Sequence, residues 1–173
     1  PTGYGQLQIS LANSLASHFT WNGSVSTNWN ESSNWTPTGI PDAKSSVVIP
    51  NASTTPNDPT LVTTELKSLH IESGGILNSD LSTVLTINGE SGAWMNMGGT
   101  FNPNNSNVVF RSANPTISGI TDVNNIVINS GTVLWIEGGS YIRIHGTFIN
   151  NGVCRSVLGD PSTVEYCGGD QTV

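Results

Sequence analysis

Short hydrophobic segments with an alternating pattern dominate the chain from about Thr60 onward. Apolar residues recur at every second position, and the segments follow one another at roughly 8–12 residue spacing. No stretch combines the apolar spacing of a helix with good helix formers. The pattern predicts an all-β protein with little helix. Its first strands centre near Leu69–Ile71, Ile76, Leu85–Ile87, Trp94, Val108–Phe110 and Ile117.

The second half of the chain also echoes the first at a constant offset. Thr64–Gly74 is matched by Thr121–Gly131, and Leu85–Gly89 by Ile142–Gly146. A fixed internal period is typical of stacked units that cannot bury their apolar face alone. We therefore expect a parallel β-helix, or β-solenoid, with a period of about 57 residues that continues beyond Val173. A β-sandwich is the alternative, because it also has short strands at this spacing.

The repeat predicts which side chains form the core. Residues that hold matching places one period apart should point inward and stack as paired ladders. These residues are Leu69, Ile71, Ile87, Ile126, Ile128 and Ile144.

The chain divides into three parts. Residues 1–18 contain the alternating stretch Gln6–Leu11, which predicts a separate strand or linker that pairs with a sheet edge, a preceding domain or another subunit. Residues 19–60 are rich in tryptophan and are expected to cap the first coil, since an open coil edge invites strand addition. Their indole N–H groups are expected to meet turn carbonyls. Residues 61–173 carry the repeats.

Composition and charge narrow the partners. The net charge is −7, with 5 Lys and Arg against 12 Asp and Glu. Too few cations are present to displace counterions from phosphates, which argues against nucleic acid and anionic membranes. The apolar runs are only a few residues long, so we expect no membrane insertion.

Cys154 and Cys167 are the two cysteines, and both lie in the last part of the chain. In an oxidising location they would form one disulfide that closes a short loop. The alternative is a pair of small buried thiols. We favour the disulfide, which would place the protein outside the cell or on its surface.

The five tryptophans are the group best suited to bind a ligand. An exposed indole is a stacking platform for a sugar ring. The alternative is that they are core and cap residues, which the position of three of them favours. The candidates are Trp21, Trp29, Trp35, Trp94 and Trp135.

Catalytic and metal-binding patterns are sparse. His18, His70 and His145 are not spaced as metal ligands, so we expect no metal and no cofactor. Some β-helix enzymes that degrade polysaccharides use paired carboxylates on one face. Four charged residues could share a face in this way, but the sequence does not fix their separation, and we expect no enzymatic activity. They are Glu72, Asp80, Glu137 and Arg143.

One set of motifs is familiar. The N-terminal set comprises Phe19–Gly23, Ser26–Trp29, Ser33–Pro37, Gly39–Pro41 and Val47–Pro50, and Gly99–Phe101, Asn107–Phe110, Thr116–Gly119 and Asn125–Asn129 follow. These motifs resemble secreted β-solenoid regions of large Bacteroidota cell-surface adhesins, which usually leave the cell by type IX secretion. The resemblance covers about residues 19–173 and brings no catalytic residues with it.

Three functions follow from these observations. The first is a non-enzymatic structural or adhesive module of a long extracellular surface protein or filament. Its partners would be other domains of the same chain, further copies of itself, or a cell-surface glycan or protein. The second is a carbohydrate-binding module that uses the tryptophans, and the third is a polysaccharide-degrading β-helix enzyme.

Overall fold

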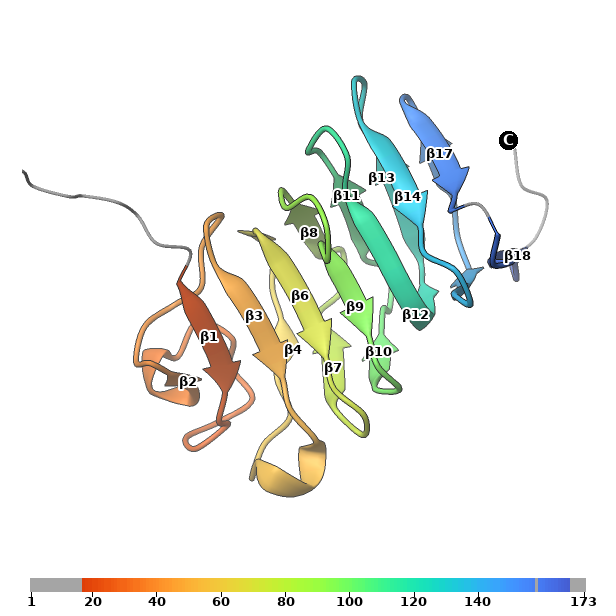
Figure 1. Ribbon diagram of the computed structural model, residues 1–173. Helices are drawn as coiled ribbons and strands as arrows, with labels where there is room; N and C mark the ends of the chain where they lie inside the picture. The colour runs from red at the N-terminus through yellow and green to blue at the C-terminus, as the bar shows by residue number, and fades with distance from the viewer. Residues whose placement is uncertain (1–16, 158, 169–173) are drawn as a thin grey trace, which may run out of the picture.

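The protein is a β-solenoid of about five turns built from parallel strands (Figure 1). The structure is a computed structural model that describes residues 17–157 and 159–168. The predicted strand Gln6–Leu11 lies outside these residues. The described part is nearly all β, with only two 3-10 turns at Ser32–Asn34 and Ala52–Thr54, so the predicted fold class is confirmed.

The coils from β3 to β16 each contribute a strand to each of three faces. The first face contains β1 (His18–Trp21), β3 (Ser46–Ile49), β6 (Ser68–Ile71), β9 (Trp94–Asn96), the first half of β12 (Thr116–Val123), β14 (Val133–Ile136) and β17 (Val153–Ser156). β2 (Trp35–Thr36) pairs with β1 in antiparallel orientation.

The second face contains β4 (Thr60–Leu61), β7 (Ile76–Ser79), β10 (Thr100–Asn102), the second half of β12, β15 (Tyr141–Ile144) and β18 (Thr163–Tyr166). The third face contains β5 (Thr64–Leu66), β8 (Val84–Ile87), β11 (Asn107–Phe110), β13 (Asn125–Ile128) and β16 (Phe148–Asn150). Except for the β1–β2 pair, the strands on all three faces pair in parallel.

One coil is much shorter than the period that the sequence suggested. From β3 onward, the step from one coil to the next is shortest, at 18 residues, where Thr60 pairs with Asn78 and where Asn107 pairs with Asn125. It is longest, at 25 residues, where Leu69 pairs with Trp94. The other parallel pairs fall within these limits. The offset that relates Thr64 to Thr121 is therefore a little under three coils and does not connect equivalent positions.

The predicted core residues all point inward, but their partners are not those expected. Leu69 lies on the first face, whereas Ile126, its match in the repeat, lies on the third. Leu69 instead stacks between Val47 and Trp94. The expected paired ladders are thus wrong, while the burial of the six side chains is confirmed, at 0–3% exposure.

Inward positions form continuous ladders because side chains alternate between the two faces of a strand. On the first face one ladder runs through Phe19, Val47, Leu69, Trp94, Ile117 and Ile136 and ends at Ser156. The core is therefore a single apolar column along the axis.

β12 passes from the first face to the second without a break. Its first half pairs with β9 and β14, and its second half pairs with β15. Gly119 lies at the bend with φ +90°, a conformation that side chains rarely adopt, and a Cβ there would overlap the carbonyl oxygen of Asn96.

Candidate functional site

Three buried tryptophans form a cluster that caps the N-terminal end of the described stack, and we call it the tryptophan cap. Trp21, Trp29 and Trp35 are at most 1% exposed. Trp35 packs edge-on against the other two, with ring centroids 4.9 and 4.6 Å away. The predicted position over the first coil is confirmed, because β1 pairs with β3 and Asn28 bridges to Thr60 of β4.

Two of the three indoles meet carbonyl oxygens as expected. Trp21 Nε1 donates to the Asn57 carbonyl at 2.7 Å, and Trp35 Nε1 donates to the Trp29 carbonyl at 2.8 Å. Trp29 Nε1 is buried and has no hydrogen-bond partner among the described residues.

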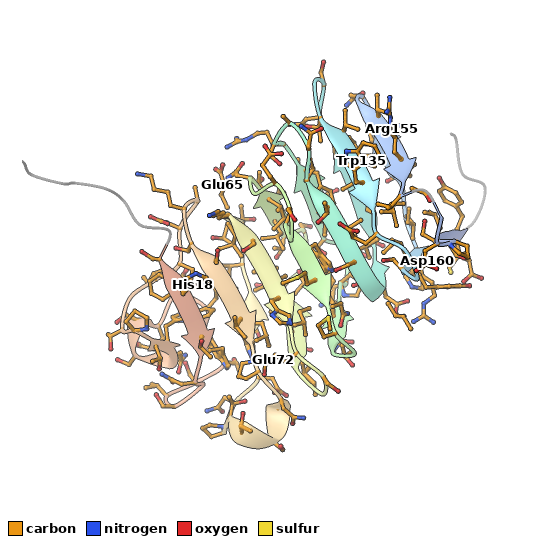
Figure 2. All side chains as sticks on the ribbon, in the orientation of Figure 1. His18, Glu65, Glu72, Trp135, Arg155 and Asp160 are labelled. Atoms are coloured by element: carbon orange, nitrogen blue, oxygen red, sulfur yellow. The ribbon has the colours of Figure 1, made fainter. Side chains whose placement is uncertain are left out.

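The predicted tryptophan surface for glycans does not form. Trp94 is fully buried, because it holds an inward position between Leu69 and Ile117. Trp135 holds an outward position of β14 and is half-buried, with the Arg155 guanidinium 5.5 Å from its ring centroid (Figure 2). Four of the five candidates are thus core residues, and the fifth is covered by its neighbour.

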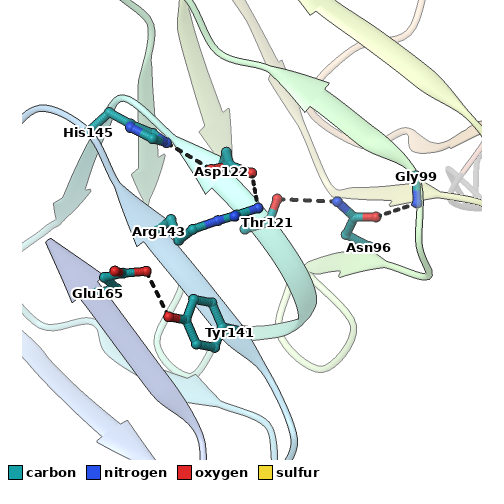
Figure 3. Close-up of polar contacts among 8 residues, drawn as sticks. All are labelled: Asn96, Gly99, Thr121, Asp122, Tyr141, Arg143, His145 and Glu165. Carbon is teal, nitrogen blue, oxygen red and sulfur yellow. Dashed lines mark hydrogen bonds and ion pairs between the residues drawn. The ribbon is translucent and has the colours of Figure 1, made fainter. Parts of the chain in front are cut away.

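A polar cluster instead lies on the outside of the second face, where β12, β15 and β18 run side by side (Figure 3). Asp122 accepts a hydrogen bond from Arg143 Nη2 at 2.6 Å and contacts His145 Nε2 at 2.8 Å. Each of these contacts joins neighbouring coils. The three side chains are 32–45% exposed, so the ion pair between Arg143 and Asp122 contributes at most about 1 kcal/mol.

The next coil extends the same row. Arg143 pairs in register with Glu165, and the Tyr141 hydroxyl donates to Glu165 Oε2 at 2.7 Å. This hydrogen bond, followed by desolvation, raises the pKa of Tyr141 above its ordinary value. A similar polar row crosses the third face, where Arg111 bonds to Glu65 and Asn88. Polar groups therefore tie successive coils together on two faces.

A shallow hollow of about 240 Å³ lies beside the cluster, between β10 and β12. Asp122 and Arg143 form one side of it, and Asn96, Gly99 and the exposed Ile120 line the rest. Asn96 is buried, and its side-chain oxygen accepts from the backbone N–H groups of Gly98 and Gly99. Rigid strands thus present a carboxylate, a guanidinium and an apolar side chain to one small concave surface.

The four charged residues expected to share a catalytic face do not converge. Glu72 and Glu137 follow first-face strands three coils apart, and Asp80 follows a strand of the second face. Arg143 lies in the polar cluster, where it is already paired with Asp122.

The histidines are likewise separated. His18 lies on β1 and His70 on β6, while His145 follows β15. Within the described residues no group of three or more His, Cys, Asp and Glu side chains is placed to hold a metal ion.

The predicted disulfide is wrong, because both cysteines are free thiols. Cys154 lies on the first face and pairs in register with the inward Leu134, so it faces the core. Cys167 follows the inward position of Tyr166 on the second face and is exposed. Strand alternation therefore directs the two side chains to opposite sides of the coil wall. Burial raises the pKa of the Cys154 thiol, and desolvation followed by the nearby Glu165 carboxylate raises the pKa of Cys167.

The end of the stack opposite the cap presents an apolar surface, which we call the open end. It comprises the outer edges of β16, β17 and β18, with which no strand among residues 17–157 and 159–168 pairs. Each of these strands exposes an apolar side chain, namely Ile149, Val153 and Tyr166.

A hollow of about 200 Å³ enters the core at the open end. Its wall is almost wholly apolar, and it includes Leu134, Ile136, Ile142, Phe148, Cys154 and Val164. The solenoid thus has one sealed end and one open end.

Sequence reasoning missed both the polar cluster and the open end. Asp122 and Arg143 are neighbours one coil apart, and so are Arg143 and Glu165. Such spacings carry no signal while the coil length is unknown.

In the described residues no helix is long and apolar enough to cross a membrane.

Comparison with known proteins gives one match. Residues 20–133 match the family described as "Domain of unknown function (DUF8693)". No curated protein and no solved structure matches the chain. Because the match covers about two thirds of the chain, from the tryptophan cap to the start of β14, the protein belongs to the DUF8693 family.

Proposed function

We propose that the protein is a non-enzymatic structural and adhesive module of an extracellular surface protein or filament. The solenoid would act as a rigid spacer, and the open end would be the surface on which the next unit stacks, either a further coil of the same long chain or another copy. The observation that carries this proposal is the contrast between the sealed tryptophan cap and the apolar open end. Unpaired strand edges and an apolar hollow on one surface favour strand addition.

The rest of the surface supports a structural role. The polar rows on the second and third faces join one coil to the next, and their carboxylates are engaged by neighbouring side chains. Such rows stiffen a stack of coils rather than leave reactive groups free. The extracellular location and the Bacteroidota adhesin relationship belong to this proposal through the resemblance of residues 19–173.

A charge placed on the open end tests the proposal. Val153→Lys puts a cation on the outward side of the edge strand β17, where lysine opposes strand pairing. Leu81→Lys is the matched control, because Leu81 is 70% exposed and lies between β7 and β8, away from the open end. Circular dichroism and thermal unfolding would check that both variants fold.

Sedimentation velocity over a range of protein concentrations gives the readout. The parent chain and Leu81→Lys should associate alike, whereas Val153→Lys should raise the dissociation constant at least about tenfold, equivalent to about 1.4 kcal/mol. A parent chain that stays monomeric at all concentrations, or equal association of the two variants, would contradict the proposal.

The second-face hollow favours a carbohydrate as a second candidate ligand. Charged and amide groups beside the exposed Ile120 suit a sugar, which needs hydrogen bonds at its rim and apolar contact on its face. Arg143→Ala should abolish binding in a glycan array, and Trp135→Ala should leave it unchanged. Binding that depends on Trp135 and not on Arg143 would exclude this hollow as the site.

A further inference from the structure

The hollow on the second face marks a break in the wall of the solenoid. On this face β10 pairs with β7 and the second half of β12 pairs with β15, and within the described residues no ladder joins β10 to β12. The first and third faces continue past the same coils, where β9 pairs with β12 and β8 pairs with β11. We infer that the break is a binding site for one uncharged sugar ring. This inference rests on the carbohydrate proposed for the hollow and names its class.

The break arises at the corner between the first and second faces. Asn96 of β9 pairs in register with Gly119 of β12, so the two coils enter the corner together. After Asn96 the chain passes through residues 97–99 before β10 begins, whereas β12 continues through Ile120 directly onto the second face. The two strands therefore leave the corner out of step, and the hollow of about 240 Å³ lies between them. Described coils flank the hollow on both sides, so its shape does not depend on either end of the chain.

Both edges of the break present hydrogen-bonding groups that need partners. Backbone groups along a strand point alternately to its two neighbours, so those of β10 and β12 that would join the two strands face the break. Arg143 Nε is also buried, with no hydrogen-bond partner in the described part of the chain. A hydroxyl group both donates and accepts hydrogen bonds. The hydroxyls of a sugar can therefore bond to N–H and C=O groups alike.

The charges at the hollow favour a ligand without net charge. Asp122 and Arg143 are joined by a hydrogen bond of 2.6 Å, so the pair as a whole is neutral (Figure 3). An anionic ligand would have to displace Asp122 from Arg143, and it would approach a chain of net charge −7. A cationic ligand would have to displace Arg143 from Asp122. A neutral ring can bond to both side chains while their ion pair stays intact.

Size and apolar surface fit a single ring. A cavity of roughly 150 Å³ holds one benzene molecule, so a hollow of about 240 Å³ admits one six-membered sugar ring but not two. Ile120 lies in its wall and is 57% exposed, which offers apolar contact to the C–H face of the ring. A single ring that enters from outside is the chain end or a side branch of a glycan.

Titration of the full chain with small glycosides tests the inference. The probes are the methyl glycosides of glucose, galactose and mannose, each compared with the uronic acid and the amino sugar of the same ring. Amide chemical shifts in two-dimensional NMR give the readout, because they report on the unpaired strand edges directly. Amides of residues 100–102 and 120–123 should shift on binding. Those of residues 107–110, whose ladder on the third face is unbroken, should not.

Two variants at the hollow and one matched control locate the site. Arg143 and Arg111 both bond to a carboxylate of another coil, but Arg111 does so on the third face. Thr100 is exposed in the wall of the hollow, so Thr100→Tyr fills it and leaves the ion pair in place. Arg143→Ala and Thr100→Tyr should each raise the dissociation constant of the best neutral glycoside at least about tenfold, and Arg111→Ala should leave it unchanged. Circular dichroism would check that the variants fold.

The best neutral glycoside should bind at least about tenfold more tightly than its uronic acid and its amino sugar, and a disaccharide of the same sugar should bind within about threefold of it. Preference for a charged sugar, a requirement for two or more rings, or no shift with any neutral glycoside would overturn the inference. The glycan array separates the two proposals. Binding there that depends on Arg143 but is limited to charged or longer glycans would keep the carbohydrate proposal and remove the single neutral ring. No binding in either assay would remove both.

Discussion

At the residue scale, the indole hydrogen bonds of the tryptophan cap can be separated from its packing. Trp35→Phe and Trp29→Phe remove similar volumes from the same cluster. Only the first also breaks a hydrogen bond, and it leaves the buried Trp29 carbonyl unpaired. We expect Trp35→Phe to lower the free energy of unfolding by about 1–3 kcal/mol more than Trp29→Phe, measured by urea denaturation. Equal losses would show that the hydrogen bond does not stabilise the cap.

Burial within the ladders makes a second residue-scale prediction. Ile128 is fully buried on the third face, stacked on Phe110, so Ile128→Ala should cost about 2–5 kcal/mol. Ile149 lies in the strand paired with it but points outward, and Ile149→Ala should change stability by only about 0.5 kcal/mol. Chemical denaturation of both variants checks the assignment of faces, and a larger loss for Ile149→Ala would contradict it.

At the element scale, the bend of β12 depends on a glycine for two reasons. Gly119 and Gly131 have similar positive φ angles, +90° and +82°, but a Cβ meets the Asn96 backbone only at Gly119. Gly131→Ala should therefore cost only the conformational penalty of about 1–2 kcal/mol. Gly119→Ala should cost distinctly more or prevent folding, which thermal unfolding followed by circular dichroism will show. Equal melting temperatures would mean that the bend relaxes without strain.

The strands and their inward residues could be predicted from the alternation of apolar and polar residues, because this alternation depends only on local strand geometry. The coil length could not be predicted from the sequence. Inward positions that stack in one ladder differ as much as Leu69, Trp94 and Ile117, so ladder partners share hydrophobicity rather than identity. The similarity between the two halves of the chain relates strands that lie on different faces. These strands resemble one another because each alternates apolar and polar residues.

The candidate sites could not be predicted without the coil length. Asp122, Arg143 and Glu165 become one row only when the strands β12, β15 and β18 are known to be neighbours in register. The cysteines did carry a usable signal. The alternation Val164, Glu165, Tyr166 already places Cys167 on the outward side, which disfavours a bridge to a core-facing Cys154.

At the scale of the whole molecule, the cap makes the stack asymmetric. Deletion of residues 19–45 would expose the inner edge of β3 and the apolar column beneath it. The shortened chain should aggregate through strand addition at that edge, measured by light scattering during thermal unfolding. A deletion variant that stays as soluble and as stable as the parent chain would remove the capping role of this segment.

We propose that the protein assembles through the open end and not through the capped end. Hydrogen–deuterium exchange at low and high protein concentration tests it most directly, because unpaired amides of an edge strand gain protection only when another strand covers them. We predict that amides of β17 exchange at least tenfold more slowly at high concentration, while those of β1 and β2 are unchanged. Exchange of β17 that is independent of concentration, or protection that appears at β1 and β2 instead, would contradict the account.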